Sequence, residues 1–386
     1  WAQVFLLYYY LNQNNRLLLI DLSSVLKKIN LPLGEDDFKE PLSILLDDYS
    51  NASNLNRLGA LTFENGIKEK LKARAKLLNF VNSNNLEEPS SPIIISGLPR
   101  SGTTYLFDLM YCFEEFRGPL TWELFEMMPV AKSKYHRAYK QVKTELRLAL
   151  FRALVPNLMN IHHMKSNLPE ECQLITALDF KSISFAYSAR VPNYQHFIGH
   201  CDYSSAFMWH KRFLQAMETT MKPNYWLLKD PCHIHHIEEI LNAYPDAKFI
   251  FIHRNPIEVI GSISSLTFNL RSAFSQRVDN VELGKESLSF WGNASKEFLT
   301  QRRQIPESNM VDINFLNFTN DPIGSIEAIF KKFNIDLKQE TREKMLSFAE
   351  QKTQLSLKHN YSLDEFGLKE EKVNKVFNAY RNEFNL

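Results

Sequence analysis

Residues 91–104 read Ser-Pro-Ile-Ile-Ile-Ser-Gly-Leu-Pro-Arg-Ser-Gly-Thr-Thr, and this stretch decides the fold. Its three consecutive isoleucines are β-branched and predict a short buried strand. Gly97 and Gly102 then bound a tight loop, and Thr103 opens a helix. The unpaired N–H groups at a helix start attract an anion, which glycine allows to approach the backbone closely. The stretch therefore predicts a strand, a loop and a helix that hold a phosphate-like group.

The loop differs from the ATP- and GTP-binding loop G-x-x-x-x-G-K-[ST] in the position of its cation. Gly97 and Gly102 keep the glycine spacing, but Thr103 stands where that loop has lysine. Arg100 supplies a cation inside the loop instead, and its planar guanidinium suits the oxygens of a phosphate or phosphosulfate. A glycine turn without a ligand is the alternative, and it requires all these residues to coincide by chance.

The composition excludes several classes of protein. The 386 residues are 44% hydrophobic, enough to bury a sizeable core, and 45 basic against 44 acidic residues give a net charge of +1. No overall field therefore attracts nucleic acid or an anionic membrane. The four cysteines form no C-x-x-C pair, which indicates neither zinc nor a redox pair. We expect a reducing compartment and a cytoplasmic protein, with a lumenal location as the alternative.

Residues 1–90 are predicted to be an N-terminal helical segment packed on the core. Leucines and isoleucines recur at helical spacing over residues 22–80. The apolar runs at 4–11 and 17–22 are each shorter than the roughly 20 residues that span a bilayer. We expect a packed helix there, and contact with a membrane or a partner is the alternative.

The rest of the chain, residues 91–386, is predicted to be the catalytic part of a single globular unit. Residues 225–229 and 248–254 are apolar strand candidates followed by helical patterns, and 310–315 is a further candidate. Strands alternating with helices predict an α/β fold, a P-loop-like parallel sheet flanked by helices. Ligands then bind at the carboxyl ends of the strands. Residues 116–123 are expected to be extended, and the Phe-, Met- and Leu-rich insertion 122–164 to form a helical acceptor pocket.

Four motifs carry a resemblance to a known family. They are Leu98-Pro-Arg-Ser-Gly-Thr-Thr, Trp226-Leu-Leu-Lys-Asp-Pro, Phe251-Ile-His-Arg-Asn-Pro and His359-Asn-Tyr-Ser-Leu-Asp-Glu-Phe-Gly-Leu. Together they resemble sulfotransferases that use 3′-phosphoadenosine 5′-phosphosulfate (PAPS), the broad group with bacterial and tyrosylprotein enzymes. The resemblance covers about residues 93–386. It implies PAPS as donor, adenosine 3′,5′-bisphosphate (PAP) as product, and no metal.

The resemblance also implies roles for individual residues. Arg254 and Ser262, eight residues apart, correspond to the pair that holds the 3′-phosphate, and Lys229 corresponds to the lysine at the bridging oxygen. The loop would hold the 5′ end through Pro99, Arg100, Ser101, Gly102, Thr103 and Thr104. A surface ion pair for Arg254 and a salt bridge for Lys229 are the structural alternatives.

The general base for the acceptor hydroxyl is left open by the sequence. Pro231 stands where aryl and steroid sulfotransferases have a histidine. Glu123 best matches the glutamate of the tyrosylprotein enzymes, and we favour it. His162 or its neighbour His163 comes second, and Glu171, in the same His-x₆-Pro-Glu-Glu segment, is expected to form a structural ion pair.

The acceptor is predicted to be a small apolar or aromatic molecule with a hydroxyl group, and nucleic acid is not expected as a partner. A P-loop kinase that uses ATP is the second reading, against which Thr103 argues. A non-catalytic nucleotide-binding module is the third. The cluster His233, His235 and His236 lacks a carboxylate or cysteine that completes a metal pattern, so we expect capping or solvent exposure there.

Overall fold

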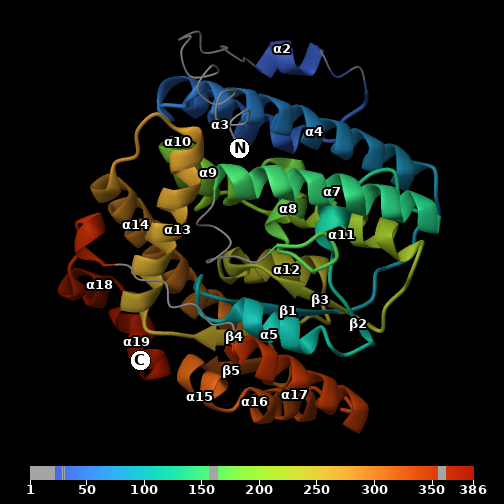
Figure 1. The fold of residues 1–386 in the computed structure, drawn as a ribbon, viewed down its shortest axis with the longest axis vertical. Helices are drawn as coiled ribbons and strands as arrows, with labels where there is room; N and C mark the ends of the chain where they lie inside the picture. The colour runs from blue at the N-terminus through green and yellow to red at the C-terminus, as the bar shows by residue number, and fades with distance from the viewer. Residues whose placement is uncertain (1–21, 28, 30, 156–163, 355–361) are drawn as a thin grey trace.

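The computed structural model describes residues 22–27, 29, 31–155, 164–354 and 362–386, and the strands of this part form one parallel sheet (Figure 1). The strand order is β2-β3-β1-β4-β5. The strands are β1 (Pro92–Gly97), β2 (Phe116–Arg117), β3 (Tyr225–Lys229), β4 (Lys248–His253) and β5 (Met310–Asn314). The predicted α/β fold with a parallel sheet is confirmed.

Strand β1 is central, between β3 and β4. Ile95 pairs with Lys229 on one side and with Ile250 on the other, and Gly97 pairs with Ile252. All six residues of β1 are buried, as the isoleucine run predicts. Since neighbouring parallel strands end at the same edge, the ends of β3, β1 and β4 lie side by side.

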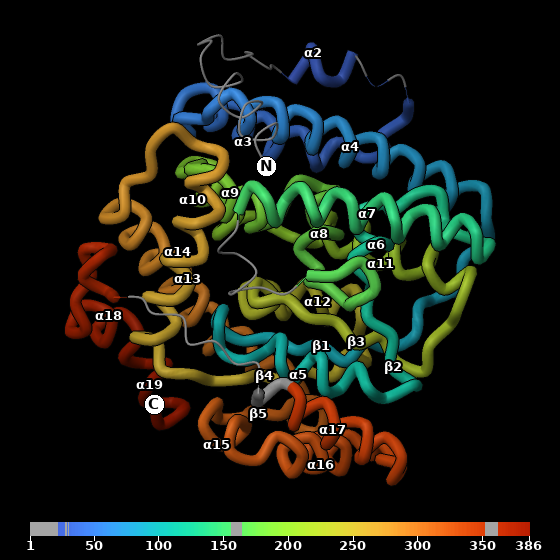
Figure 2. The backbone as a smooth tube through the Cα atoms, viewed as in Figure 1, coloured from blue at the N-terminus to red at the C-terminus, as the bar shows by residue number. Residues whose placement is uncertain are grey.

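Helices cover both faces of the sheet (Figures 1 and 2). Ile93 and Ile95 face one hydrophobic cluster, whose helices are α5 (Thr103–Met110), α16 (Pro322–Lys332) and α17 (Gln339–Gln354). Ile94 faces the other, larger cluster, as the alternation of side chains along a strand requires. The remaining helices are α2 (Leu22–Lys27), α3 (Lys39–Asn51), α4 (Arg57–Asn82), α6 (Thr121–Phe125), α7 (Lys134–Leu154), α8 (Gln173–Thr176), α9 (Ser184–Ser188), α10 (Pro192–Ile198), α11 (Ser204–Glu218), α12 (Ile237–Ala243), α13 (Pro256–Phe274), α14 (Asn280–Gln301), α15 (Phe315–Asn320), α18 (Glu370–Val376) and α19 (Asn378–Phe384).

Two predicted elements need correction. Residues 116–123 are not one extended piece, because α6 begins at Thr121 and places Glu123 on a helix. The side chain of Glu123 accepts a hydrogen bond from the Leu120 N–H at 3.0 Å, which satisfies a donor at the helix start. The helical pattern expected after residues 225–229 begins instead as a 3₁₀ turn, Pro231–His235, and α12 starts only at Ile237.

The N-terminal helices α3 and α4 share the larger hydrophobic cluster with the sheet. Leu42 of α3 and Leu71 of α4 belong to the same cluster as Ile94 and Trp226. Among the described residues, no helix is both long enough and apolar enough to cross a membrane.

Candidate active site

The loop between β1 and α5 has a backbone that depends on its glycines. Gly97 has φ 144°, and a Cβ there would lie 2.4 Å from the carbonyl oxygen of Ile252. Gly102 caps α5 in the left-handed conformation with φ 87°, and Arg100 is also left-handed with φ 64°. The loop thus brings backbone N–H groups and the start of α5 to the end of the central strand.

The hydroxyl of Ser101 supports a ligand in this loop. Ser101 is completely buried, and no described residue forms a hydrogen bond with its Oγ. A buried polar atom without a partner costs free energy, and a ligand oxygen at the start of α5 would remove that cost. The residues of the loop therefore fit an anionic group.

Lys229, the last residue of β3, brings a buried cation to the loop. Its Nζ donates hydrogen bonds to Thr104 Oγ1 at 3.0 Å and to Glu171 Oε1 at 2.8 Å. Burial alone would lower the pKa of Lys229, but the carboxylates of Glu171 and Glu170 outweigh it and raise the pKa above its ordinary value. Lys229 is therefore positively charged at neutral pH.

Asp230, which follows Lys229, is a second buried carboxyl group at this edge of the sheet. Burial, with the charge of Glu171 as the next cause, raises the pKa of Asp230 to about 8. Its Oδ1 accepts a hydrogen bond from the Cys232 N–H at 2.9 Å. Asp230 is therefore largely protonated at neutral pH and caps the turn that follows β3.

Arg254 and Ser262 both contact Arg100. Arg254 Nη1 donates to the carbonyl oxygen of Arg100 at 2.7 Å, and Arg100 Nε donates to Ser262 Oγ at 3.2 Å. The guanidinium of Arg254 also lies 4.2 Å from the ring centre of Phe315 and pairs with Glu258 one turn along α13. The ion pair that we considered as the alternative for Arg254 is thus present as well.

Glu123 lies in a different environment. Its Oε1 pairs with Arg117 Nη2 at 2.7 Å, and both side chains are buried. Arg117 stacks at 4.8 Å on Trp226, three residues before Lys229 in β3. Through Arg117, Glu123 is therefore linked to the amino-terminal half of β3. Glu171, in contrast, contacts Lys229 at the carboxyl end of β3 directly.

A cavity of about 130 Å³ lies beside Glu123. Its walls include Trp122, Lys140, Met127 and Met217, from α6, α7, α11 and the segment between α6 and α7. The insertion predicted to face the acceptor thus contributes to a cavity with both apolar and charged walls.

The structure describes only some of the histidines named in the sequence analysis. His162 and His163 lie outside the described residues. The expected solvent exposure of His233, His235 and His236 is wrong, since all three are buried and burial lowers the pKa of each. His236 does stand at the N-cap position of α12, although its side chain forms no capping hydrogen bond. Among the described residues, no group of three or more His, Cys, Asp or Glu could hold a metal ion.

The contact between Glu171 and Lys229 was missed by sequence reasoning. Glu171 was expected to form an ion pair, but its partner was not identified. A backbone hydrogen bond from the Cys172 N–H to the Lys229 carbonyl, 3.0 Å long, fixes the segment beside the end of β3. The Pro-Glu-Glu segment was the available signal, and the tertiary contact could not be predicted from it.

The chain is similar to several known proteins. The sequence model of the sulfotransferase family matches residues 92–339. The ω-hydroxy-β-dihydromenaquinone-9 sulfotransferase Stf3 of Mycobacterium bovis is 22% identical over 258 residues, and the match spans 63% of this chain and 63% of that protein.

Two solved structures share the fold. Sulfotransferase STF9 of Mycobacterium avium superposes with a TM-score of 0.84 at 23% identity, covering 97% of this chain and 98% of that chain. Sulfotransferase STF1 of Mycobacterium tuberculosis H37Rv gives 0.80 at 23% identity, covering 94% of this chain and 100% of that chain. Because the family model matches well over half of its residues, the chain belongs to the sulfotransferase family.

Proposed function

We propose that this protein transfers a sulfuryl group from PAPS to the hydroxyl group of a small apolar or aromatic acceptor. The observation that carries the proposal is the cluster at the ends of three adjacent strands. The anion-binding loop follows β1, Lys229 ends β3, and Arg254 follows β4. Family membership supports sulfuryl transfer, and cations from the loop, from the end of β3 and from the end of β4 suit a donor with a phosphate at each end.

The donor would be held by residues from the loop and from α13. The N–H groups at the start of α5, with Arg100 and Ser101, would bind the 5′ end. Arg254 and Ser262 would bind the 3′-phosphate, and their contacts with Arg100 already bring them beside the loop. When bound, PAPS supplies an activated sulfuryl group.

The transfer needs charge stabilisation and alignment more than covalent chemistry from the protein. A bond forms between the acceptor oxygen and sulfur while the bond from sulfur to the bridging oxygen of the 5′-phosphate breaks. Lys229 would stabilise the charge that develops on the leaving phosphate. The acceptor hydroxyl loses its proton to a base, and cations and N–H donors suffice for this scheme without a metal.

We assign the general base to Glu171. Its carboxylate lies 2.8 Å from the Nζ of Lys229. If Lys229 binds the leaving phosphate, a base beside it would be placed near the acceptor hydroxyl. Glu123, which we favoured from the sequence, stays the alternative. Both oxygens of each glutamate accept hydrogen bonds, from Arg117 and the Leu120 N–H in Glu123 and from Lys229 and the Gln173 side-chain amide in Glu171. Glu171 is preferred because it contacts Lys229. His162 stays a prediction outside the described residues.

An apolar acceptor is supported by two observations. The name of the relative from Mycobacterium bovis gives a hydroxylated dihydromenaquinone as its acceptor. The cavity beside Glu123 has Trp122, Met127 and Met217 among its walls. We therefore infer that the acceptor of this chain is also an apolar molecule with a hydroxyl group.

Calorimetric titration with PAP, without Mg²⁺, tests the donor assignment. We expect the native protein to bind and Arg254→Ala to bind roughly ten- to a hundredfold more weakly, since a hydrogen bond to a charged group is lost. Arg57→Ala, an exposed arginine at the start of α4, is the matched control and should bind as the native protein does. Adenosine 5′-monophosphate, which lacks the 3′-phosphate, should bind no better to the native protein than to the variant. If the native protein bound PAP and adenosine 5′-monophosphate with equal affinity, the result would contradict PAPS as the donor and favour an ATP-dependent kinase.

A further inference from the structure

Helix α7 carries an apolar stripe on its solvent side. Tyr135, Tyr139, Val142, Leu146 and Leu150 are between 56% and 77% exposed. Their spacing of three and four residues places them on one face of the helix, along its whole length. Single exposed apolar residues are ordinary on protein surfaces, but a contiguous row of five marks an interaction surface.

The opposite face of α7 packs on the protein. Lys140, Thr144 and Leu148, each four residues apart, are its buried positions. Lys140 Nζ lies 6.0 Å from the ring centre of Trp122 and donates to the carbonyl oxygen of Glu126 at 2.6 Å. In Figure 1, α7 lies in front of α8 and α11. The exposed fractions of its five apolar side chains place the stripe on the solvent side of the helix.

The helix is also strongly basic. Residues 132–154 contain seven Lys or Arg and one acidic residue, Glu145. Glu126, Glu69 and Glu145 pair with the basic residues of its middle and carboxyl end. No carboxylate of the described residues pairs with the exposed residues Lys132, Lys134 and Arg137 at its amino end.

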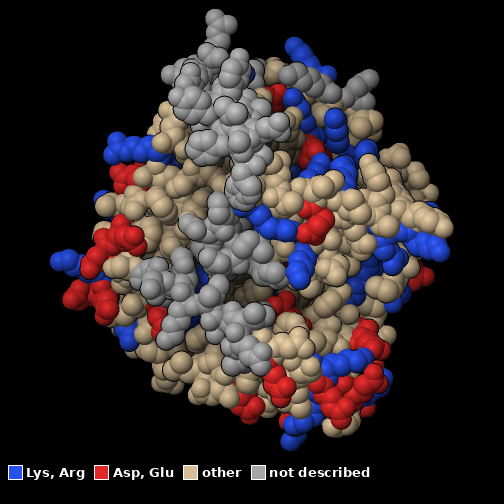
Figure 3. All heavy atoms as spheres, viewed as in Figure 1, with Lys and Arg blue, Asp and Glu red and all other residues tan. Residues whose placement is uncertain are grey.

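Charge and apolar side chains are thus adjacent on one surface. Lys134 Nζ lies 5.3 Å from the ring centre of Tyr135, at the amino end of the stripe. Arg137 lies on the other face of the helix, where it lines the cavity together with Lys140. In Figure 3, uncharged surface lies over part of α7, with both basic and acidic side chains beside it. Tyrosine is favoured where one end of a side chain is apolar and the other is hydrated.

We propose that this stripe docks the protein on the surface of an anionic lipid membrane. Apolar side chains would enter the boundary between headgroups and acyl chains, and Lys132 and Lys134 would contact anionic headgroups. A second copy of this chain fits less well, because the basic margins of two helices would meet in one interface. The purpose of docking rests on the proposed function, because an apolar acceptor would be drawn from that membrane.

Cosedimentation with vesicles tests the proposal on the 386-residue chain. Vesicles of phosphatidylglycerol and phosphatidylcholine in equal parts should bind the protein, and added salt or phosphatidylcholine alone should weaken binding. Leu146→Asp should bind at least about tenfold more weakly, since it loses one buried apolar side chain and adds a like charge to the lipid. Leu316→Asp on α15 is the matched control, because Leu316 is 64% exposed and Leu146 is 67% exposed. Binding of this control should equal that of the native protein.

Two results would overturn docking by α7. One is unchanged vesicle binding of Leu146→Asp. The other is a native dimer that this variant converts to a monomer in light scattering, which would make the stripe a subunit interface. PAP binding is measured on the same proteins, so that docking and the proposed use of PAPS are tested separately. Vesicle binding without PAP binding would support membrane docking and contradict the proposed PAPS-dependent activity.

Discussion

At Lys229 the parallel sheet places a fully buried cation against α5, where Thr104 accepts one of its hydrogen bonds. We expect Lys229→Ala to lower turnover by roughly 10²–10³, because a donor aimed at the developing charge is lost. PAP affinity should change little, since Arg254 and the loop remain. Turnover of a PAPS donor and calorimetry on the same protein check this. A turnover close to native would show that another group stabilises the leaving phosphate.

Replacing Glu171 or Glu123 by glutamine should have different effects on turnover and stability. Glu171→Gln should lower kcat roughly 10²–10⁴-fold and abolish the acidic limb of its pH profile, as expected when a general base is lost. Glu123→Gln should leave Arg117 buried without its counter-charge and lower the free energy of unfolding by roughly 3–5 kcal/mol. Turnover per folded molecule should stay near native. The opposite pattern would return the role of base to Glu123.

Asp230 gives a prediction about pH. Its pKa rises from 3.8 to about 8 on folding, so the native state binds more protons than the unfolded state between these values. Stability should therefore fall as pH rises through this range, by at most about 1.4 kcal/mol per pH unit from this group. Asp230→Asn keeps an acceptor for the Cys232 N–H and removes the ionisation. Denaturant unfolding from about pH 5 to about pH 8 should show a flatter dependence for the variant, and an equal slope would contradict the shift.

At the scale of single residues, the sequence predicts which residues stand at strand ends. It does not predict which distant residues come into contact in the folded protein. Lys229 and Arg254 were placed at strand ends because apolar runs precede them, and the structure brings both beside the loop. The partner of Glu171 could not be predicted, because 58 residues separate it from Lys229 and several short helices lie between them. Burial of His233 depends in the same way on tertiary contacts, with Phe207 of α11 among its neighbours.

At the scale of elements, the long apolar strands were predictable and the short helices were not. β1, β3 and β4 are continuous apolar runs, which a sheet covered on both faces requires. Helices such as α8 and α9 have four or five residues, so tertiary contacts rather than sequence pattern stabilise them. α14 was also not predicted, although it has 22 residues and an apolar face.

Strand β1 and its loop give a prediction through Gly97. A Cβ at this position would lie 2.4 Å from the Ile252 carbonyl, a backbone atom of β4 that cannot move alone. Gly97→Ala should therefore lower the free energy of unfolding by more than about 3 kcal/mol and weaken PAP binding. Gly66→Ala in α4 is the matched control, since nothing lies within 4 Å of a Cβ there. It should stabilise the protein by about 0.5–1 kcal/mol, as alanine does within a helix. Denaturant unfolding of both variants checks this, and equal unfolding midpoints for Gly97→Ala and Gly66→Ala would contradict this account of the loop.

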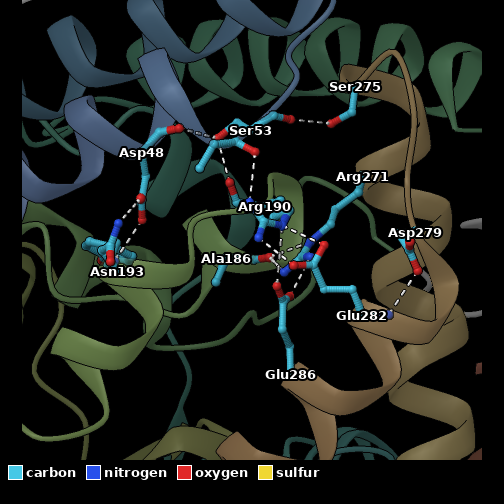
Figure 4. Close-up of polar contacts among 12 residues, drawn as sticks. Asp48, Ser53, Ala186, Arg190, Asn193, Arg271, Ser275, Asp279, Glu282 and Glu286 are labelled. Carbon is cyan, nitrogen blue, oxygen red and sulfur yellow. Dashed lines mark hydrogen bonds and ion pairs between the residues drawn. The ribbon is translucent and has the colours of Figure 1, made fainter. Parts of the chain in front are cut away.

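At the scale of the whole molecule, polar contacts join the N-terminal helices to the catalytic part. Figure 4 shows Asp48 of α3 with Asn193 of α10, at 2.8 Å, and Arg271 at the end of α13 with Glu286 of α14, at 2.7 Å. Ser53 and Ser275 bridge these two groups. Since α13 begins beside the loop and carries Ser262, the same helix contacts both the site and the N-terminal layer.

A buried arginine gives the strongest of these connections. Arg74 of α4 is completely buried, and its Nη1 pairs with Asp179 at 2.7 Å. Its other donors reach the carbonyl oxygens of Leu33 and Glu35, and its guanidinium lies 4.0 Å from the ring centre of Trp209. Removing Arg74 would leave the buried carboxylate of Asp179 with Lys181, 3.3 Å from its Oδ2, as the remaining counter-charge. It would also remove the donor to the carbonyl oxygens of Leu33 and Glu35.

We therefore predict that residues 22–90 and the catalytic part unfold together. Arg74→Met should lower the free energy of unfolding by about 3–5 kcal/mol, whereas Arg57→Met, an exposed arginine of the same helix, should change it by less than about 0.5 kcal/mol. Amide hydrogen exchange should be accelerated equally in α4 and in β1 of the Arg74→Met variant, because one hydrophobic cluster includes side chains of both. Exchange that accelerates in α4 and leaves β1 protected would show that the N-terminal helices are a separate unit, and Arg74 would then stabilise only their attachment.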